Sequence, residues 1–363
     1  MKKIYTQPRI ETVATTPQQM VCASGGIKAQ ISGYKQKPGN GFTQPVIIGV
    51  ICSSLLMLGT ACSTNNNPDQ PKQQAELKPR TLIVTQQAVS RLPQATITEN
   101  GDVLDALWNE GDKVFYRNLS RNEYIDPDTE ESVSLSGTLS ADKDGSVASF
   151  SGERVWCDED DQLALIYPAL DVENHPDLFT FHTDLLTAEY IISVVGQDGS
   201  LATLAEKYHH IYGIASVVSV TGTTANAELA EMKSLMTVCK FSFEDKDNPG
   251  TSLPISTLEI SMGGGAYVDT YPQKGTVSIA QNVSAGDVSV DPEWETTDDG
   301  GKPLTIDTQG ANPEEVYVAL FPQPKLSYTF TVTSGGHTYT GEATATLNAG
   351  EYVVASLKLT KNN

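Results

Sequence analysis

The chain has 363 residues, and 24 lysine and arginine residues against 45 aspartate and glutamate residues give it a formal net charge of −21. Nucleic-acid binding is therefore not expected, because neutralising phosphates requires clustered Lys and Arg side chains. The acidity instead favours a solvated, self-repelling surface. The length after Cys62 suits roughly two domains.

A charge-free apolar run from Val46 to Ala61 ends at Cys62. The run is shorter than the about 20 residues of a transmembrane helix and lies near the upper limit of a signal-peptide apolar region. The small residues before Cys62 resemble a bacterial lipobox, although Gly59 stands where Leu is usual. We predict a leader or signal region at residues 1–61 and a lipid, with palmitate as one acyl chain, on Cys62. The alternative is an uncleaved anchor helix or a buried core helix.

The segment that follows, residues 62–79, is rich in Asn, Gln, Pro and Lys and has no apolar periodicity. Such a composition is typical of a disordered tether. It predicts a flexible leash that displays the rest of the chain at the cell surface, beyond the outer membrane.

Residues 80–245 alternate between short apolar runs and turn residues, which indicates β-strands. A helix is predicted at Ser200–His209, where apolar residues share one helical face, and Ala227–Met236 is ambiguous because it also fits a helical period. The predicted strands are Thr81–Val89, Val114–Tyr116, Ser132–Leu139, Ser146–Phe150, Leu163–Tyr167, Ile211–Val220 and Thr237–Phe243.

The charged segment Asp245–Gly250 ends in Pro-Gly and is predicted to divide the chain into two halves. Regular short strands with turn signals argue for a β-sandwich in each half. We therefore expect an all-β fold of two tandem β-sandwiches, at 80–245 and 246–363, with minor helical insertions. The strands predicted in the second half are Ile255–Ser261, Thr276–Ala280, Val316–Phe321, Tyr328–Thr333, His337–Thr340, Ala343–Leu347 and Tyr352–Leu359.

Motifs for catalysis or cofactor binding are missing from the sequence. It has no G-x-S-x-G elbow, P-loop, dinucleotide fingerprint or HExxH pair. The adjacent His209 and His210 are expected at the surface or in a turn. The sequence leaves open whether Cys157 and Cys239 form a disulfide or remain buried thiols. We predict that the protein is not an enzyme and holds no metal or cofactor.

The order of several short motifs resembles a known family. The motifs are Trp108-Asn109-Glu110-Gly111-Asp112, Ala148–Gly152 (ASFSG), Leu165–Ala169 (LIYPA), Glu315–Pro322 (EVYVALFP), Thr340-Gly341-Glu342 and Asn348–Tyr352 (NAGEY). Together with the cysteine and its leash, they resemble the fimbrillin (FimA-like) lipoproteins over about residues 80–363. These proteins are the subunits of type V pili in anaerobic Gram-negative bacteria of the gut and mouth, and the resemblance implies transthyretin-like sandwiches.

The resemblance also implies a mode of assembly. Fimbrillins polymerise when an Arg-specific protease removes the first strand and the strand of a neighbouring subunit takes its place. Here Arg91 follows the first predicted strand and is the expected cleavage site, whereas a cut at Arg80 would leave the strand in place. An ordinary surface arginine is the alternative for Arg91.

The donor strand in this family comes from the C-terminal region. The last predicted strand places Val353, Ala355, Leu357 and Leu359 on one side, as a donor requires. An ordinary internal strand of the second sandwich is the alternative. The implied partners are other pilus subunits, in a homo- or heteropolymer, the Arg-specific protease, and the outer membrane through the lipid before maturation.

The function predicted from these features is a structural or accessory subunit of a fimbrium that serves cell adhesion. The alternative is a surface lipoprotein that binds glycan and does not polymerise. Trp108 and Trp156 lie beside strand motifs and are expected in the core, which leaves Trp294 as the candidate platform for a sugar ring.

Overall fold

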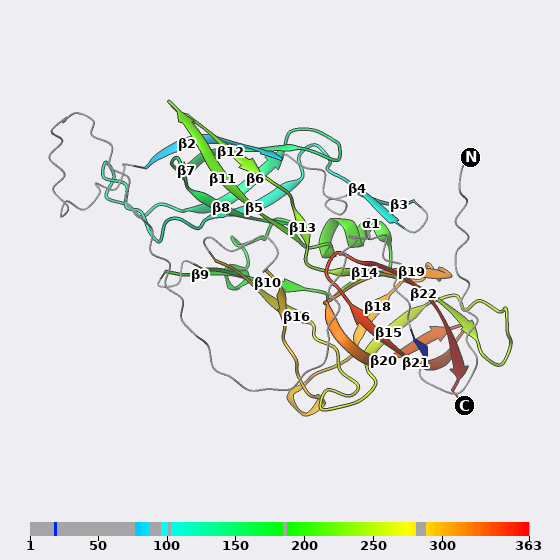
Figure 1. The fold of residues 1–363 in the computed structure, drawn as a ribbon. Helices are drawn as coiled ribbons and strands as arrows, with labels where there is room; N and C mark the ends of the chain where they lie inside the picture. Colours follow the sequence, from blue (N-terminus) through cyan, green and yellow to red (C-terminus); the bar gives the residue numbers. More distant parts are fainter. Residues whose placement is uncertain are drawn as a thin grey trace, which may run out of the picture. The chain divides into compact units, whose positions relative to one another are not determined.

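The structure is a computed structural model, and its described residues are 18–19, 77–86, 96–100, 103–183, 187–280 and 288–362. The lipid site Cys62 and the cleavage site Arg91 lie outside these ranges, and so does the predicted leader except for residues 18–19. The described part of the chain is almost entirely β, with two large sheets (Figure 1), as the sequence predicted.

The first large sheet contains β2, which covers most of the first strand that the sequence predicted. Its strand order is β12-β2-β7-β6-β5-β8-β11-β13, and β12 also pairs with β11, so the ladder closes around one core. The strands are β2 (Lys78–Gln86), β5 (Lys113–Asn118), β6 (Ser136–Ala141), β7 (Ser149–Cys157), β8 (Gln162–Tyr167), β11 (Ile211–Thr221), β12 (Thr224–Leu229) and β13 (Lys233–Ser234).

Strands β5 and β8 are buried on both faces. Val114 and Tyr116 join the cluster inside the closed sheet, whereas Phe115 between them joins the larger cluster on the other side. Leu163–Tyr167 behaves in the same way, because successive side chains point to opposite faces of a strand. This double burial explains why the run reads as continuously apolar and confirms its prediction as a buried strand.

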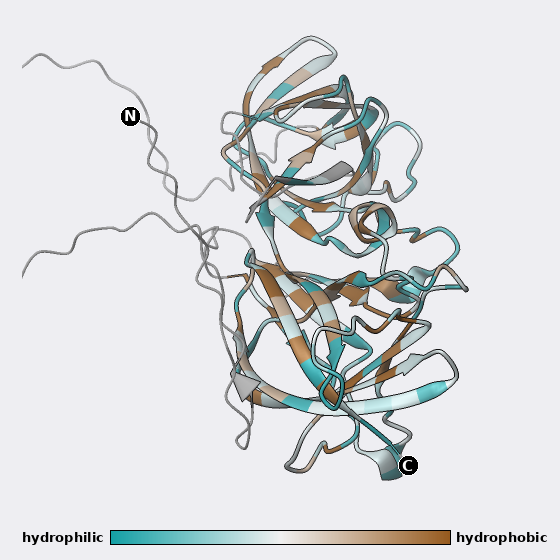
Figure 2. Cartoon of the chain, turned by 90° about the vertical axis from the view of Figure 1, so that its right-hand side faces the viewer, coloured by the Kyte–Doolittle hydropathy of each residue, from teal (hydrophilic) through white to brown (hydrophobic). Residues whose placement is uncertain are grey.

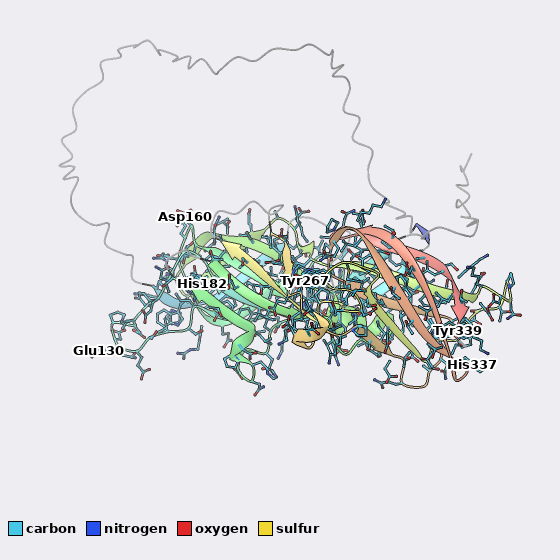
Figure 3. The ribbon with its side chains drawn as sticks, turned by 90° about the horizontal axis from the view of Figure 1, so that it is seen from below. Glu130, Asp160, His182, Tyr267, His337 and Tyr339 are labelled. Carbon is cyan, nitrogen blue, oxygen red and sulfur yellow. The ribbon has the colours of Figure 1, made fainter. Side chains whose placement is uncertain are left out.

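The second large sheet has the order β18-β15-β20-β21-β22-β14-β19, and β1 (Gln18–Gln19) pairs with β21. Gly335 and Gly336, with φ of 56° and 79°, form the tight turn between β20 and β21, and His337 and Tyr339 lie close to it (Figure 3). The strands are β14 (Thr237–Asp245), β15 (Thr257–Met262), β18 (Leu304–Asp307), β19 (Glu315–Leu320), β20 (Gln323–Ser334), β21 (His337–Leu347) and β22 (Tyr352–Lys361).

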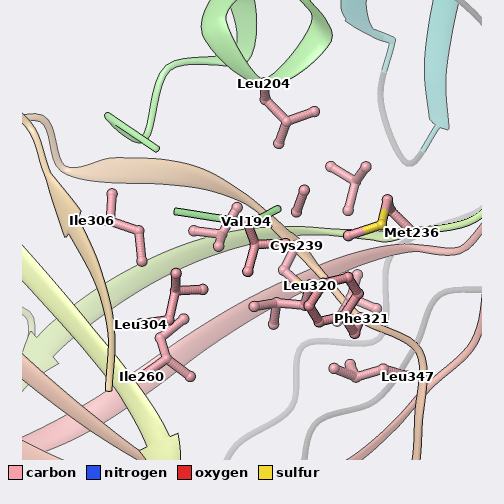
Figure 4. Packing of buried hydrophobic residues seen from close by; sticks show 14 of the residues in the cluster. Val194, Leu204, Met236, Cys239, Ile260, Leu304, Ile306, Leu320, Phe321 and Leu347 are labelled. Atoms are coloured by element: carbon pink, nitrogen blue, oxygen red, sulfur yellow. The ribbon is translucent and has the colours of Figure 1, made fainter. Parts of the chain in front are cut away.

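A third sheet, of order β17-β16-β10-β9, joins strands from both halves of the sequence. It consists of β9 (Phe179–His182), β10 (Thr187–Ser193), β16 (Lys274–Ala280) and β17 (Val290–Pro292). Its buried side chains share one cluster with the second large sheet, and Figure 4 shows Val194, which follows β10, packed among residues such as Cys239 and Leu320. One sheet therefore draws its strands from both of the predicted halves.

The remaining elements are short. A hairpin is formed by β3 (Thr96–Asn100) and β4 (Val103–Leu107). The predicted helix at Ser200–His209 is confirmed as α1 (Leu201–Thr203), which continues into a π-helical turn at Leu204–Tyr208. Two single 3₁₀ turns lie at Pro176–Leu178 and Thr297–Asp299.

The expected domain borders need correction. β14 pairs with β19 and β22, so it belongs to the second large sheet although it precedes residue 246. Asp245–Gly250 is a turn at the end of β14, where Asp245 N–H donates to the carbonyl of Thr251. β2 starts at Lys78, inside the expected leash at 62–79. Charged segments that contain Pro and Gly occur at turns within a domain as well as between domains, so they do not by themselves mark a domain border. The residues of a strand also do not show which distant strand it pairs with.

One local expectation changes, and the structure decides two points that the sequence left open. His209 and His210 are buried rather than exposed. Ala227–Met236 contains the end of β12 and the short β13, so its helical period was misleading. Cys157 and Cys239 are buried in different clusters and are not joined by a disulfide. Trp108 and Trp156 are buried, as expected.

Candidate functional site

The first strand, β2, fills a slot between two other strands of the closed sheet. It runs parallel to β12, with Ala225 opposite Leu82, and antiparallel to β7, with Phe150 opposite Val84. The side chains alternate strictly, so that Leu82 and Val84 are fully buried while Ile83 between them is 36% exposed. Figure 2 shows hydrophobic and more polar residues alternating along several strands of the chain. Burying these two side chains stabilises the fold by roughly 3–6 kcal/mol.

Polar side chains form hydrogen bonds at both ends of β2. At the beginning, Arg80 donates from Nε to the carbonyl of Cys157 (3.0 Å) and from Nη1 to the carbonyl of Gly222 (2.6 Å). Its Nη2 also lies 3.7 Å from Oδ1 of Asp158. At the other end, Nε1 of Trp108 donates to Oε1 of Gln86 (3.3 Å). These buried contacts fix the register of β2 against both neighbours.

The position of β2 in the chain makes it removable. It precedes every other strand of its sheet, so its loss breaks no connection between the strands that remain. The strands β7 and β12 would then each expose a row of unpaired backbone groups beside an apolar slot. Such an edge is a template for pairing with another strand.

The last strand, β22, has a related arrangement in the second large sheet. Val353, Ala355, Leu357 and Leu359 are all buried, and the residues between them are exposed or half-buried. At Gly341 of β21 a side chain would collide with Leu359, because Cδ2 of Leu359 lies 2.6 Å from the position of a Cβ. The predicted donor strand therefore serves as an internal strand in this structure.

The hydrogen bonding of β22 is one-sided over most of its length. Tyr352–Leu359 pairs in parallel with β14, whereas only Thr360 and Lys361 pair with β21. No other pairing of β22 is found among the strands of the described residues. The last strand is thus held by one full ladder, in contrast to β2, which is held by two.

The two strands carry the same pattern of side chains. Leu357-Lys358-Leu359-Thr360 in β22 corresponds to Leu82-Ile83-Val84-Thr85 in β2, with two large apolar residues facing inward in each case. Both strands also run parallel to one neighbour, β12 or β14. The two strands therefore share an alternating side-chain pattern and one parallel neighbour each.

The structure gives Arg80 a structural role. From the sequence, Arg80 was considered only as a position where a protease could cut. Its side chain is 9% exposed and its backbone lies inside a paired strand, so a protease cannot reach it in the folded chain. No sequence pattern predicts the hydrogen bonds of Arg80, because the carbonyls that accept them are distant in the chain. The bond between Gln86 and Trp108 was likewise not predicted.

Metal sites, reactive thiols and membrane-spanning helices have little support in the structure. The described residues contain no group of His, Cys, Asp or Glu side chains that could hold a metal ion. Burial raises the pKa of the Cys157 thiol to about 12, so this thiol is not a reactive thiolate near neutral pH. Within the same residues, none of the helices has the length and apolar character that crossing a bilayer requires.

The ring of Trp294, which was the candidate sugar platform, packs against other aromatic rings of the protein. Its ring lies 5.1 Å from that of Tyr267 and 6.3 Å from that of the buried Tyr271. Figure 3 marks Tyr267. A separate polar cavity of about 440 Å³ lies where β6 and β7 diverge, and carboxylates of Glu131 and Glu153 line it together with several hydroxyl groups.

Comparison with known proteins gives matches among solved structures. No family model and no curated protein matches the chain. A protein of Bacteroides uniformis that is provisionally assigned to cell adhesion covers 81% of this chain and 98% of its own, with 11% identity and a TM-score of 0.45. A fimbrial assembly protein of Parabacteroides distasonis covers 77% and 90%, with 9% identity and a TM-score of 0.37. The tip fimbrial protein Mfa3 of Porphyromonas gingivalis covers 77% and 95%, with 9% identity and a TM-score of 0.34.

Proposed function

We propose that the protein is a subunit of a fimbrium that assembles by strand exchange, serves cell adhesion and catalyses no reaction. The observation that carries the proposal is the position of β2, which precedes every other strand of its sheet, fills a slot between β7 and β12, and shares its inward side-chain pattern with β22. After loss of β2, the last strand of a second subunit fills the slot.

The hydrogen-bond pattern makes this exchange favourable. In its own sheet, β22 pairs with one strand over Tyr352–Leu359. In the slot of a neighbour it would lie between two strands and would gain a second ladder. Each net hydrogen bond contributes about 0.5–1.5 kcal/mol, so several additional bonds can offset the loss of the intramolecular pairing.

The maturation steps belong to the same proposal. A lipid on Cys62 holds the precursor at the outer membrane, and an Arg-specific protease cuts after Arg91. The cut separates β2, together with the lipid and the leash, from the remainder of the chain. The subunit then joins other copies or other pilus subunits at the cell surface.

Limited proteolysis of the purified full-length chain tests the proposal. After treatment with an arginine-specific protease, we expect a ladder of bands on an unboiled SDS gel and a new N-terminus at Leu92. Arg91→Ala should abolish the ladder. Arg154→Ala, which changes an exposed arginine elsewhere in the first sheet, should leave it intact.

A single band after complete cleavage at Arg91 would contradict the proposal. It would favour the alternative of a surface lipoprotein that binds glycan as a monomer. A fragment pattern showing that Arg91 is never cut, while the ladder still forms, would reject only the assignment of the cleavage site.

A further inference from the structure

A single carboxylate from the β3–β4 hairpin contacts three strands of the second large sheet. Oε2 of Glu99 accepts a hydrogen bond from the hydroxyl of Tyr317 (2.7 Å), and Oε1 accepts one from the hydroxyl of Tyr352 (2.9 Å). Nζ of Lys240 lies 3.0 Å from both oxygens. We name these four residues the Glu99 clamp.

The donors of the Glu99 clamp come from neighbouring strands. Lys240 lies on β14 directly opposite Tyr317 on β19, and Tyr352 is the first residue of β22. The three side chains alternate with neighbours such as Cys239 and Val353, so they project from the opposite face of the sheet, where Tyr352 is itself buried and Lys240 and Tyr317 are half-buried. The clamp therefore depends on β22 being in place beside β14.

The hairpin that carries Glu99 is itself anchored. Leu104 and Ala106 of β4 are buried in the same large cluster as the core of the second sheet. The position of the carboxylate is consequently fixed by apolar packing as well as by its hydrogen bonds. In the sequence, the hairpin lies just after Arg91, so it would stay with the subunit after cleavage.

The electrostatics keep the clamp charged. Burial raises the pKa of Glu99, but the hydrogen bonds from Tyr317, Lys240 and Tyr352 lower it by more, so its pKa lies below the ordinary value. Lys240 also forms an ion pair with Glu315 at 2.8 Å. Its side chain is 13% exposed, against 27% for Glu99, so solvent screens the pair only in part.

We propose that Glu99 is a positioning residue that retains the last strand in its own sheet and so sets the rate at which β22 is donated. The inference rests on the proposed function, because it assigns a regulation to the same strand. To leave β14, the last strand must withdraw the Tyr352 hydroxyl from a carboxylate. Hydrogen bonds to charged groups are stronger than neutral ones, so this contact opposes departure.

Two phenylalanine substitutions give a matched test. Tyr352→Phe removes the hydroxyl on the last strand, and Tyr317→Phe removes the equivalent hydroxyl on β19, which is not donated. Glu99→Gln weakens the whole clamp, and Glu342→Gln, at an exposed position of β21, is the control for loss of a carboxylate.

Hydrogen exchange of the uncleaved chain is the first measurement. We expect Glu99→Gln and Tyr352→Phe to speed amide exchange in residues 353–359 by about 10-fold or more. Tyr317→Phe should change it less, and Glu342→Gln should not change it. Exchange in β7 should stay the same in all variants, which excludes general unfolding. Unchanged exchange in β22 for both Glu99→Gln and Tyr352→Phe would overturn the inference.

The rate of ladder formation after cleavage is the second measurement. The same two variants should form the ladder faster than the unsubstituted chain. Faster exchange with an unchanged ladder rate would overturn the role of Glu99 in donation. A lack of ladder in every chain, including the unsubstituted one, would instead overturn the proposed function and the donation with it, while the exchange data would still show whether Glu99 holds the strand.

Discussion

At the scale of single residues, Arg80 is the strongest polar anchor of the first strand. It bridges the end of β7 at Cys157 and the turn at Gly222. Arg80→Met keeps much of the apolar stem but leaves two carbonyls without their charged donor. We expect the free energy of unfolding to fall by about 2–4 kcal/mol, measured by urea denaturation. Thr85→Val, at an exposed position of the same strand, should change it by less than about 1 kcal/mol. Equal stability of the two variants would argue against the anchor.

The buried histidines give the protein a pH-dependent stability. Burial lowers the pKa of His209 to about 3, and that of His210 to about 4. Because the unfolded chain binds protons near pH 6.5 and the folded chain does not, stability is full above pH 6.5 and falls as the pH drops towards the folded values.

The expected size of this effect follows from the ordinary pKa of histidine. Each histidine should cost about 2 kcal/mol between pH 7 and pH 5. His209→Gln removes one of the two contributions, so urea denaturation at both pH values should show a loss that is smaller by about that amount. A loss identical to that of the unsubstituted chain would show that His209 is protonated in the folded state.

At the scale of secondary-structure elements, local pattern and distant pairing differ in how well the sequence encodes them. Leu163–Tyr167 and the last strand could be predicted from their residues, because burial on both faces gives a continuous apolar run and burial on one face gives a two-residue period. The β3–β4 hairpin was missed, although Asn100-Gly101 between two apolar stretches is a strong turn signal. Its partner residues Lys240, Tyr317 and Tyr352 follow it by more than a hundred positions, and no local rule connects them to Glu99.

The slot of the first strand can be tested with a peptide. A chain that begins at Leu92 lacks β2, so β7 and β12 would each have a free edge. We expect such a chain to form the SDS-resistant ladder without protease, because nothing fills the slot. A synthetic peptide of residues 77–86 in excess should suppress the ladder. A peptide with Leu82→Asp and Val84→Asp should not, since it would place charges in a buried slot. Equal suppression by both peptides would show that the slot is not the acceptor.

At the scale of the whole molecule, the halves of the sequence are interleaved. β14 lies between β19 and β22 in the second sheet, and β10 pairs with β16 across the expected border at residues 245 and 246. The expected division at residues 245 and 246 reflected a real turn but not a border between domains. Leu77–Asn363 belongs to one compact unit in consequence.

A cut within that turn distinguishes interleaved halves from tandem domains. If the recognition sequence of a specific protease is inserted directly after Asn248, cleavage there leaves every strand pairing intact. The turn residues are exposed, so the insertion should be tolerated. We expect the two pieces to elute together in gel filtration and to separate only in urea, because the piece that ends at Asn248 supplies the middle strand β14 to the other. Separate elution of two pieces that each unfold cooperatively would show that the halves are independent, and the retention of β22 by β14 would then not hold in solution.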